Sequence, residues 1–308
     1  MSVFIVPDGL DGERVDMVLA RMTGVSRSRV VGLITSGAVS LNGERVLKPA
    51  TKVNVGALVD VDLSEPVRVA AIKAELANGL EIVYEDPQLV VVDKPAGVAA
   101  HPSLGWEGSD VLSHLSAAGV PVTTSGAPER QGIVQRLDVG TSGLMVVAKD
   151  EHAYSLLKQQ FRDRVVDKVY LALVQGRLDP SLGTIDAPIG RHPASDWKFA
   201  VIAGGRPAVT HYETIEAHAA VSLLKIHLET GRTHQIRVHL AALRHPCVGD
   251  SLYGADPVLA TRLGLQRQWL HATHLKFRHP ATGEWVEFDS APAPDLYSAL
   301  NIVRAEYS

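Results

Sequence analysis

Cysteine is nearly absent from this chain of 308 residues, which contains only one, Cys247. A single cysteine excludes an intrachain disulfide and a zinc site built from cysteine ligands. Long hydrophobic runs are also missing, because no stretch approaches the roughly 18 apolar residues that identify a membrane-spanning helix. Residues 1–10 lack the basic and then apolar pattern of a signal peptide. We therefore expect a cytoplasmic protein that has no membrane partner.

The chain has ample material for a folded core. Hydrophobic residues make up 46% and charged residues 21%, which excludes a largely disordered chain. Its length suggests about two domains. The net charge of −4 argues against a protein that binds nucleic acid over its whole surface, yet residues 12–64 carry +2 and the remainder −6. A local basic face is therefore compatible with the overall charge.

The first segment, residues 1–64, has the pattern of a small compact domain. Apolar residues at helical spacing predict one helix over 15–22 and a second from the serines at 26 and 28 to Gly37. Strands are expected at 39–41, before the Asn42-Gly43 turn, and over 53–63. Two helices followed by a small sheet account for this segment.

A second domain follows an unpatterned, alanine-rich stretch. Residues 65–78 contain Pro66 and are expected to form a linker, which assigns 79–308 to the second domain. Because strands and helices do not alternate strictly, an α+β fold is favoured over a doubly wound one. The predicted strands are 81–84, 89–92, 133–137, 144–148, 165–174 and 221–228, and the predicted helices are 151–161 and 233–243.

Several common catalytic motifs are absent. The chain has no Gly-Lys-Ser/Thr phosphate loop and no Gly-x-Gly-x-x-Gly after a strand. The stretch from Gly140 to Leu144 fails to match the Gly-x-Ser-x-Gly elbow, because Leu144 stands where glycine is required. Thirteen histidines are present without a His-Glu-x-x-His motif, so no metal site is expected.

Three segments carry groups suited to catalysis: 135–143, 168–174 and 229–239. The first places Asp138 where a predicted strand gives way to a loop, a position that exposes a side chain while holding it rigidly. Each segment alone also has a plain structural explanation. Asp138 could close an Asx-turn, Tyr170 could be a core residue, and Arg237 could pair with a surface carboxylate.

Taken together and in order, these segments resemble the RluA/RluD family of RNA pseudouridine synthases over essentially the whole chain. The N-terminal segment resembles the small RNA-binding domain named after ribosomal protein S-four, including its Ser26-Arg27-Ser28-Arg29 helix start. The motifs that carry the first resemblance are Asp93-Lys94-Pro95-Ala96-Gly97, Arg136-Leu137-Asp138 with Thr141-Ser142-Gly143, Lys168-x-Tyr170, Thr230-Gly231-Arg232-x-His234-Gln235-Ile236-Arg237-x-His239, His245-Pro246 with Gly249-Asp250 and Tyr253-Gly254, and Leu270-His271-Ala272.

The resemblance implies an α+β protein in which a small αα-β RNA-binding domain precedes a catalytic domain. That domain would be built on a mixed, mainly antiparallel sheet with flanking helices. The implied activity is isomerisation of uridine to pseudouridine in RNA, without cofactor or metal. The two-domain layout is most similar to the RluD type, which implies large-subunit (23S) ribosomal RNA within the pre-ribosomal large subunit as the target. A monomer is the family-based expectation.

The resemblance also assigns roles to particular residues. Asp138 would be the essential carboxylate, which either attacks the ribose anomeric carbon or deprotonates the neighbouring carbon. Arg237 would pair with it, and Tyr170 would stack on the target base and serve in proton removal at carbon 5. The residues expected to contact RNA are Leu270 on the other side of the base, Arg136 in the vacated space, Arg232 at a phosphate, and Arg27 and Arg29 at the first domain.

One position departs from the family pattern. Gln135 stands where the family usually has histidine before Arg-Leu-Asp, which leaves activity intact but changes positioning or substrate preference. Two other functions are weighed against the synthase. A non-catalytic RNA-binding ribosome-assembly factor would not need the set of Asp138, Tyr170 and Arg237. A hydrolase using Asp138 with a histidine or a metal would lose activity in the presence of a chelator.

Overall fold

The computed structural model describes residues 2–25, 27–35, 37–62, 80–102 and 106–306. The predicted linker at 65–78 and the side chain of Arg29 lie outside the described part. No helix within the described part is long and apolar enough to cross a membrane.

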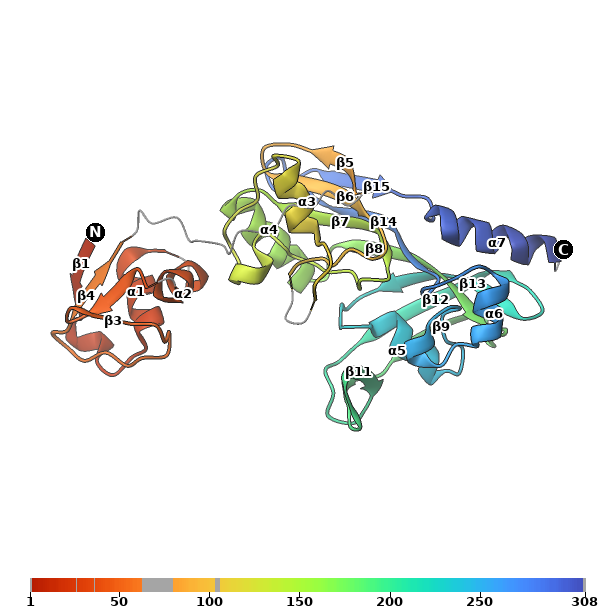
Figure 1. Ribbon diagram of the computed structural model, residues 1–308, viewed down its shortest axis with the longest axis horizontal. Helices are drawn as coiled ribbons and strands as arrows, with labels where there is room; N and C mark the ends of the chain where they lie inside the picture. Colours follow the sequence, from red (N-terminus) through yellow and green to blue (C-terminus); the bar gives the residue numbers. More distant parts are fainter. Residues whose placement is uncertain (1, 26, 36, 63–79, 103–105, 307–308) are drawn as a thin grey trace.

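The N-terminal part folds as two helices and a four-stranded sheet in the order β1-β4-β2-β3 (Figure 1). The predicted apolar stripe of the first helix is buried at Val15, Val18 and Leu19. The strand expected at Val53 does not form, because its backbone exchanges hydrogen bonds with residues 12–13 before the first helix rather than with the sheet. The elements are β1 (Ser2–Ile5), η1 (Asp8–Leu10), α1 (Val15–Thr23), α2 (Arg27–Thr35), β2 (Val39–Leu41), β3 (Glu44–Arg45) and β4 (Leu58–Val61).

The C-terminal part is built on one large sheet that contains nine of the described strands. They follow the order β5-β6-β7-β14-β8-β13-β12-β9, and β15 also pairs with β14. The strands are β5 (Glu81–Glu85), β6 (Leu89–Lys94), β7 (Ser142–Ala148), β8 (Asp167–Gln175), β9 (Leu182–Asp186), β12 (Val209–Ala217), β13 (Val221–Leu228), β14 (Leu270–Arg278) and β15 (Trp285–Asp289).

The helices and a separate hairpin complete this part. The hairpin pairs β10 (Ile189–His192) with β11 (Ser195–Val201). The helices are α3 (Val111–Ala117), α4 (Glu151–Arg162), α5 (Gln235–Ala242), α6 (Pro257–Arg262) and α7 (Pro294–Glu306), with 3-10 turns η2 (Pro128–Arg130) and η3 (Ser251–Tyr253).

The pairing of the strands confirms the predicted α+β fold with a mixed, mainly antiparallel sheet. Among the described strands of this sheet, β7 and β14 pair in parallel, through Ser142–His271 and Gly143–Ala272, while the other pairs are antiparallel. Gly143 is required there, because its φ is +115° and a Cβ would lie 2.3 Å from the Ala272 carbonyl oxygen.

Helices cover both faces of the sheet, which explains why its central strands are apolar on both sides. Along β6, Val90 and Val92 pack on the face covered by α3 and α5, whereas Leu89 and Val91 pack on the face covered by α4. A further core lies between β13 and the helices α6 and α7. The continuous apolar run at 89–92 is therefore a buried strand, as predicted.

The strand predicted at 133–137 is wrong. Gly132 has a φ of +71°, and Ile133 then makes a single isolated bridge to Val147. Beyond Ile133 the chain bends away from the sheet and lines a cavity instead. Asp138 consequently lies in an irregular segment that leads into β7, not at the end of a strand.

Candidate active site

A cavity of about 490 Å³ opens between the Asp138 segment, the start of α5 and the strands β8 and β14. It brings together residues that are far apart in the chain and that the sequence assigned to one site. Six of the predicted site residues line it: Arg136, Asp138, Tyr170, Arg232, Arg237 and Leu270.

A buried arginine between two carboxylates forms the centre of the site. Arg237 Nη1 donates to Asp138 Oδ2 at 3.0 Å. Its Nε and Nη2 donate to Asp250 at 2.7 and 2.9 Å, which makes a bidentate pair. Asp250 is almost fully buried, whereas the Asp138 side chain keeps 16% of its surface exposed toward the cavity. Arg237 is thus held by Asp250 and in turn orients Asp138.

The electrostatics of this group keep the arginine charged. Burial alone would lower the pKa of Arg237, but its hydrogen bonds to Asp250 and the charge of Asp138 outweigh burial and raise that pKa above its ordinary value. With two carboxylates sharing one guanidinium, the centre carries an excess negative charge. Asp138 is therefore an oriented carboxylate that faces the cavity.

Tyr170 and Leu270 lie on neighbouring antiparallel strands, β8 and β14. The register pairs Tyr170 with Ala272 and Ala172 with Leu270, so the two side chains are diagonal neighbours on the same face. Both are buried in the core that borders the cavity. Burial, together with the negative charge of Asp138, raises the pKa of Tyr170 above its ordinary value, so that the phenol stays protonated at neutral pH.

The predicted RNA-contacting arginines differ in their surroundings. Arg136 is exposed at the cavity, and Arg232 lines it while its Nε donates to the Pro207 carbonyl at 3.0 Å. Arg27 does not belong to this cavity. Its Nη2 lies 2.9 Å from the buried carboxylate of Asp16, so it also holds α1 and α2 together.

Gln135 is the position at which the sequence predicts a departure from the family pattern. It lines the cavity three residues before Asp138. Its Nε2 is buried and has no hydrogen-bond partner in the described part of the chain. A buried donor without a partner is costly, which makes this amide a candidate for contact with a bound substrate.

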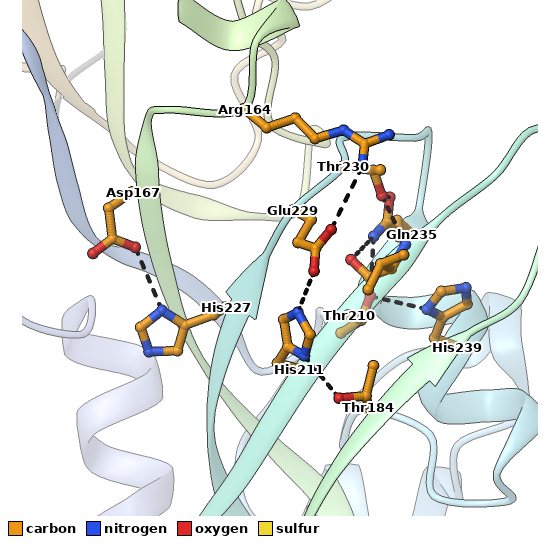
Figure 2. A network of polar contacts seen from close by, with 11 residues as sticks. Arg164, Asp167, Thr184, Thr210, His211, His227, Glu229, Thr230, Gln235 and His239 are labelled. Carbon is orange, nitrogen blue, oxygen red and sulfur yellow. Dashed lines mark hydrogen bonds and ion pairs between the residues drawn. The ribbon is translucent and has the colours of Figure 1, made fainter.

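The loop that leads into α5 is fixed by Gln235 (Figure 2). The Gln235 Nε2 donates to the Val209 carbonyl at 2.9 Å and to Thr210 Oγ1 at 3.0 Å. Its Oε1 accepts hydrogen bonds from Thr230 Oγ1 and the Arg232 amide. This network ties the loop to β12, so the side chains at the start of α5 are presented to the cavity from a rigid support.

Lys94 fixes the backbone behind Asp138. Its Nζ is fully buried and donates to the Pro95 and Val98 carbonyls at 2.9 and 2.8 Å, and lies 3.4 Å from the Val139 carbonyl oxygen. Burial lowers the pKa of Lys94 to about 7. The Asp93–Gly97 motif at the end of β6 therefore supports the Asp138 segment directly.

Close to the Asp138–Arg237 pair, the residues Asp250, His234 and Tyr253 were not among those predicted from sequence. Asp250 binds Arg237, while His234 Nε2 lies 3.9 Å from Asp138 Oδ2. Tyr253 places its ring 5.0 Å from the Arg237 guanidinium carbon. All three stand within motifs that carry the family resemblance, which was the available signal. No cluster of three or more metal-binding side chains occurs among the described residues.

Comparison with known proteins identifies the family to which the chain belongs. The model of the RNA pseudouridylate synthase family matches residues 88–242, and the S4 domain model matches residues 13–59. An RNA pseudouridine synthase of Mycobacterium bovis is 59% identical, over 98% of this chain and 97% of the relative. The ribosomal large subunit pseudouridine synthase D of Pseudomonas aeruginosa is 39% identical, over 98% and 95% of the two chains.

A solved structure has the same fold. The human RNA pseudouridylate synthase domain containing 4 superimposes with a TM-score of 0.58 at 26% identity, over 73% of this chain and 93% of its own. The family match spans half of the chain, and the relatives cover nearly all of it. The chain therefore belongs to the RNA pseudouridylate synthase family and is an RNA pseudouridine synthase with an N-terminal S4 domain.

Proposed function

We propose that this enzyme converts uridine to pseudouridine in the RNA of the large ribosomal subunit, with Asp138 as the catalytic carboxylate. The observation that carries the proposal is the pairing of Asp138 with the buried Arg237–Asp250 unit in the cavity. Relatives named ribosomal large subunit pseudouridine synthase D in Pseudomonas aeruginosa and Xanthomonas campestris, 39% and 41% identical, support the choice of RNA.

The chemistry needs an anion and an enclosed space. The reaction breaks the bond between uracil N1 and ribose C1′, turns the base, and joins C5 to C1′, while the proton of C5 is lost and N1 gains one. Asp138 either attacks C1′ or removes a proton from C2′, and both routes require the carboxylate to be ionised. Arg237 orients the carboxylate and places a positive charge beside it, and the cavity retains the detached uracil.

Tyr170 and Leu270 hold the base from two sides. The target uridine has to leave its stack, which costs a few kcal/mol. Stacking on Tyr170 and packing against Leu270 offset part of this cost. Because the phenol of Tyr170 stays protonated, it can take the C5 proton only while passing its own proton to another base. Arg136, exposed beside Asp138, is placed to occupy the space that the flipped base vacates.

The RNA is bound at two places in this proposal. Arg232 contacts phosphate at the cavity, and Arg27 and Arg29 do so on the S4 domain, at the start of α2. Residues 1–64 form the RNA-binding domain and 79–308 the catalytic domain, joined by the linker 65–78. The enzyme acts in the cytoplasm as a monomer on the pre-ribosomal large subunit.

Release of tritium from RNA labelled at uracil C5 tests the proposal. Wild type and Asp138→Asn are compared on transcripts of large-subunit ribosomal RNA and, as a control, transfer RNA. We expect release by the wild type on ribosomal RNA alone, and a loss of at least about a thousandfold for the variant. Tight binding without release would favour an assembly factor. Equal release by both proteins would reject Asp138 as the catalytic carboxylate.

A further inference from the structure

His234 connects Asp138 to a residue outside the cavity centre. It is the N-cap of α5 and has a left-handed backbone, with φ of +57°. Its Nε2 lies 3.9 Å from Asp138 Oδ2, and its Nδ1 lies 2.8 Å from the Tyr253 hydroxyl. The same hydroxyl accepts a hydrogen bond from the Phe199 amide at 3.1 Å. A chain of contacts thus runs from β11 to Asp138.

The direction of these hydrogen bonds follows from their chemistry. The Phe199 amide can only donate, so it occupies an acceptor site of the Tyr253 oxygen. Burial raises the pKa of Tyr253, which keeps its proton on the phenol. That proton is then available to His234 Nδ1, which accepts it when the imidazole is neutral. The remaining ring nitrogen, Nε2, consequently carries the hydrogen and points toward Asp138.

The charges around His234 are consistent with a neutral imidazole. Burial lowers the pKa of His234 below its ordinary value of 6.5, although the charge of Asp138 opposes this shift. Arg237 lowers it further from α5 itself, and Arg136 does so from the Asp138 segment, while Asp250 raises it from the turn before η3. Phe199 packs edge-on against the imidazole at a centroid distance of 5.7 Å.

We propose that His234 is a positioning residue whose Nε2–H orients the Asp138 carboxylate, and that Tyr253 and the β10–β11 hairpin hold it in that tautomer. The inference rests on the proposed role of Asp138. A separation of 3.9 Å is too long for a hydrogen bond, and we expect it to shorten when RNA fills the cavity. Arg237 holds Asp138 from one side and His234 would complete the set of donors.

Two substitutions at His234 separate positioning from structural support. His234→Asn preserves a polar group near Nδ1 and suits the left-handed backbone, but it removes the donor toward Asp138. His234→Gln places an amide donor near Nε2 and suits that backbone less well. We expect H234N to lower kcat about tenfold with an RNA KM within about twofold of wild type, and H234Q to recover part of the loss. A structural role predicts the reverse order, with H234N the more active.

Tyr253→Phe tests the remaining link. It removes the hydroxyl that fixes the tautomer and keeps the ring beside Arg237. We expect a several-fold loss of kcat for Y253F alone and no further loss when it is added to H234N, because both changes interrupt one path. Additive losses, or an H234N enzyme with wild-type kcat, would overturn the proposal.

The acidic limb of the kcat profile provides an independent readout. Protonation of His234 replaces its acceptor at Nδ1 with a donor, so the contact with the Tyr253 hydroxyl must rearrange. We expect the wild type to lose activity as His234 protonates below pH 6.5, and H234Q to retain its own rate to lower pH. An identical acidic limb in both proteins would contradict this role. Asp138→Asn is measured alongside and reports on the catalytic role of Asp138 itself. Failure of the proposal for Asp138 can therefore be distinguished from failure of the proposal for His234.

Discussion

Asp250 shows how much the site depends on a residue that need not touch the substrate. It takes two of the three hydrogen bonds between Arg237 and the two carboxylates, and it is almost fully buried. We expect Asp250→Ala to lower the free energy of unfolding by about 3–5 kcal/mol, because it leaves a buried guanidinium with one partner. Urea unfolding followed by circular dichroism measures this loss.

The matched control is Asp295→Ala. Asp295 also forms a bidentate pair, with Arg267, at 2.7 and 2.8 Å. Its side chain keeps 45% of its surface exposed, so the pair is screened by water. We expect this variant to lose no more than about 1 kcal/mol. Equal losses for the two variants would show that burial of the Arg237 centre is not the source of its stability.

Gln135 lines the cavity, and its Nε2 is buried without a hydrogen-bond partner in the part of the protein that the structure describes. Gln135→Met keeps the side-chain volume and removes the amide. We expect its stability to be unchanged or up to about 1 kcal/mol higher, because a buried donor without a partner is lost. RNA binding should weaken several-fold if the amide contacts RNA.

Thermal unfolding and filter binding on the same preparation measure the two effects. An unchanged RNA affinity together with higher stability would show that the amide serves neither the fold nor the substrate. Gln131→Met, four residues earlier and outside the cavity lining, is the control for a glutamine substitution in this segment.

The sequence predicted only those site residues to which the motifs of the family resemblance assign a role. Asp138, Tyr170 and Arg237 came from three separate segments, and the order of the motifs was the reason to group them. The partner of Arg237 was not predictable, because Asp250 lies 13 residues away in a turn whose position depends on the fold. His234 could not be linked to Asp138 either, because the left-handed backbone that directs it is a property of the folded loop.

At the scale of the elements, the start of α2 has a proposed role in RNA binding and a role in stability. A substitution at this position affects both. Arg27 is a proposed RNA contact, yet with Arg14 it also neutralises Asp16, whose side chain is 1% exposed. We expect Arg27→Glu to place a second carboxylate beside Asp16 and to destabilise the α1–α2 pair by about 1–2 kcal/mol. Weaker RNA binding by this variant would therefore report partly on unfolding.

Hydrogen exchange of the α1 and α2 amides in the full chain measures this effect. We expect faster exchange in R27E than in Arg21→Glu, an exposed charge reversal in the last turn of α1. That control should cost less than about 1 kcal/mol, since it acts only through the helix dipole. Equal exchange in the two variants would leave Arg27 as a clean probe of RNA binding.

Elements with a strong apolar period were predicted well, and the exceptions have physical reasons. The run at 89–92 and the helix at 151–161 are β6 and α4. In the C-terminal part, the strands β9, β10, β11, β12, β14 and β15 were not predicted. In β9 and β11, exposed and polar residues break the alternation. The spacing of Leu296, Ala299, Leu300 and Val303 indicates α7 clearly enough, although it was not among the predicted helices. The error at 133–137 arose because an apolar stretch beside a cavity resembles a buried strand.

At the scale of the whole molecule, charge is distributed unevenly. The chain has a net charge of −4, yet seven basic and only two acidic side chains line the cavity. The surplus of positive charge therefore lies at the cavity, where the proposed function brings the RNA backbone. Arg162, which ends α4, and Arg164, two residues later, add positive charge beyond the residues predicted from sequence. Because local charge determines contact, an acidic protein can still bind RNA at this face.

The seven basic side chains that line the cavity are called the basic rim: Arg130, Arg136, Arg162, Arg164, Lys168, Arg232 and Arg237. The salt dependence of RNA binding tests whether this basic rim binds phosphate. Each phosphate contact in single-stranded RNA contributes a slope of about −0.7 to the plot of log affinity against log salt. Arg162→Glu replaces a positive charge at the cavity with a negative one, at a side chain that is 72% exposed. We expect a slope less steep by about one contact and weaker RNA binding at low salt, with kcat at saturating RNA unchanged.

Arg262→Glu provides the matched comparison for the basic rim. Arg262 ends α6, pairs with Glu306 of α7 and lies outside the cavity lining. The substitution Arg262→Glu changes the net charge of the chain by the same amount as Arg162→Glu. If the rim binds phosphate, R262E should keep the wild-type salt slope while R162E does not. If binding follows net charge alone, the two variants should shift together, and the local charge of the cavity would have no special role.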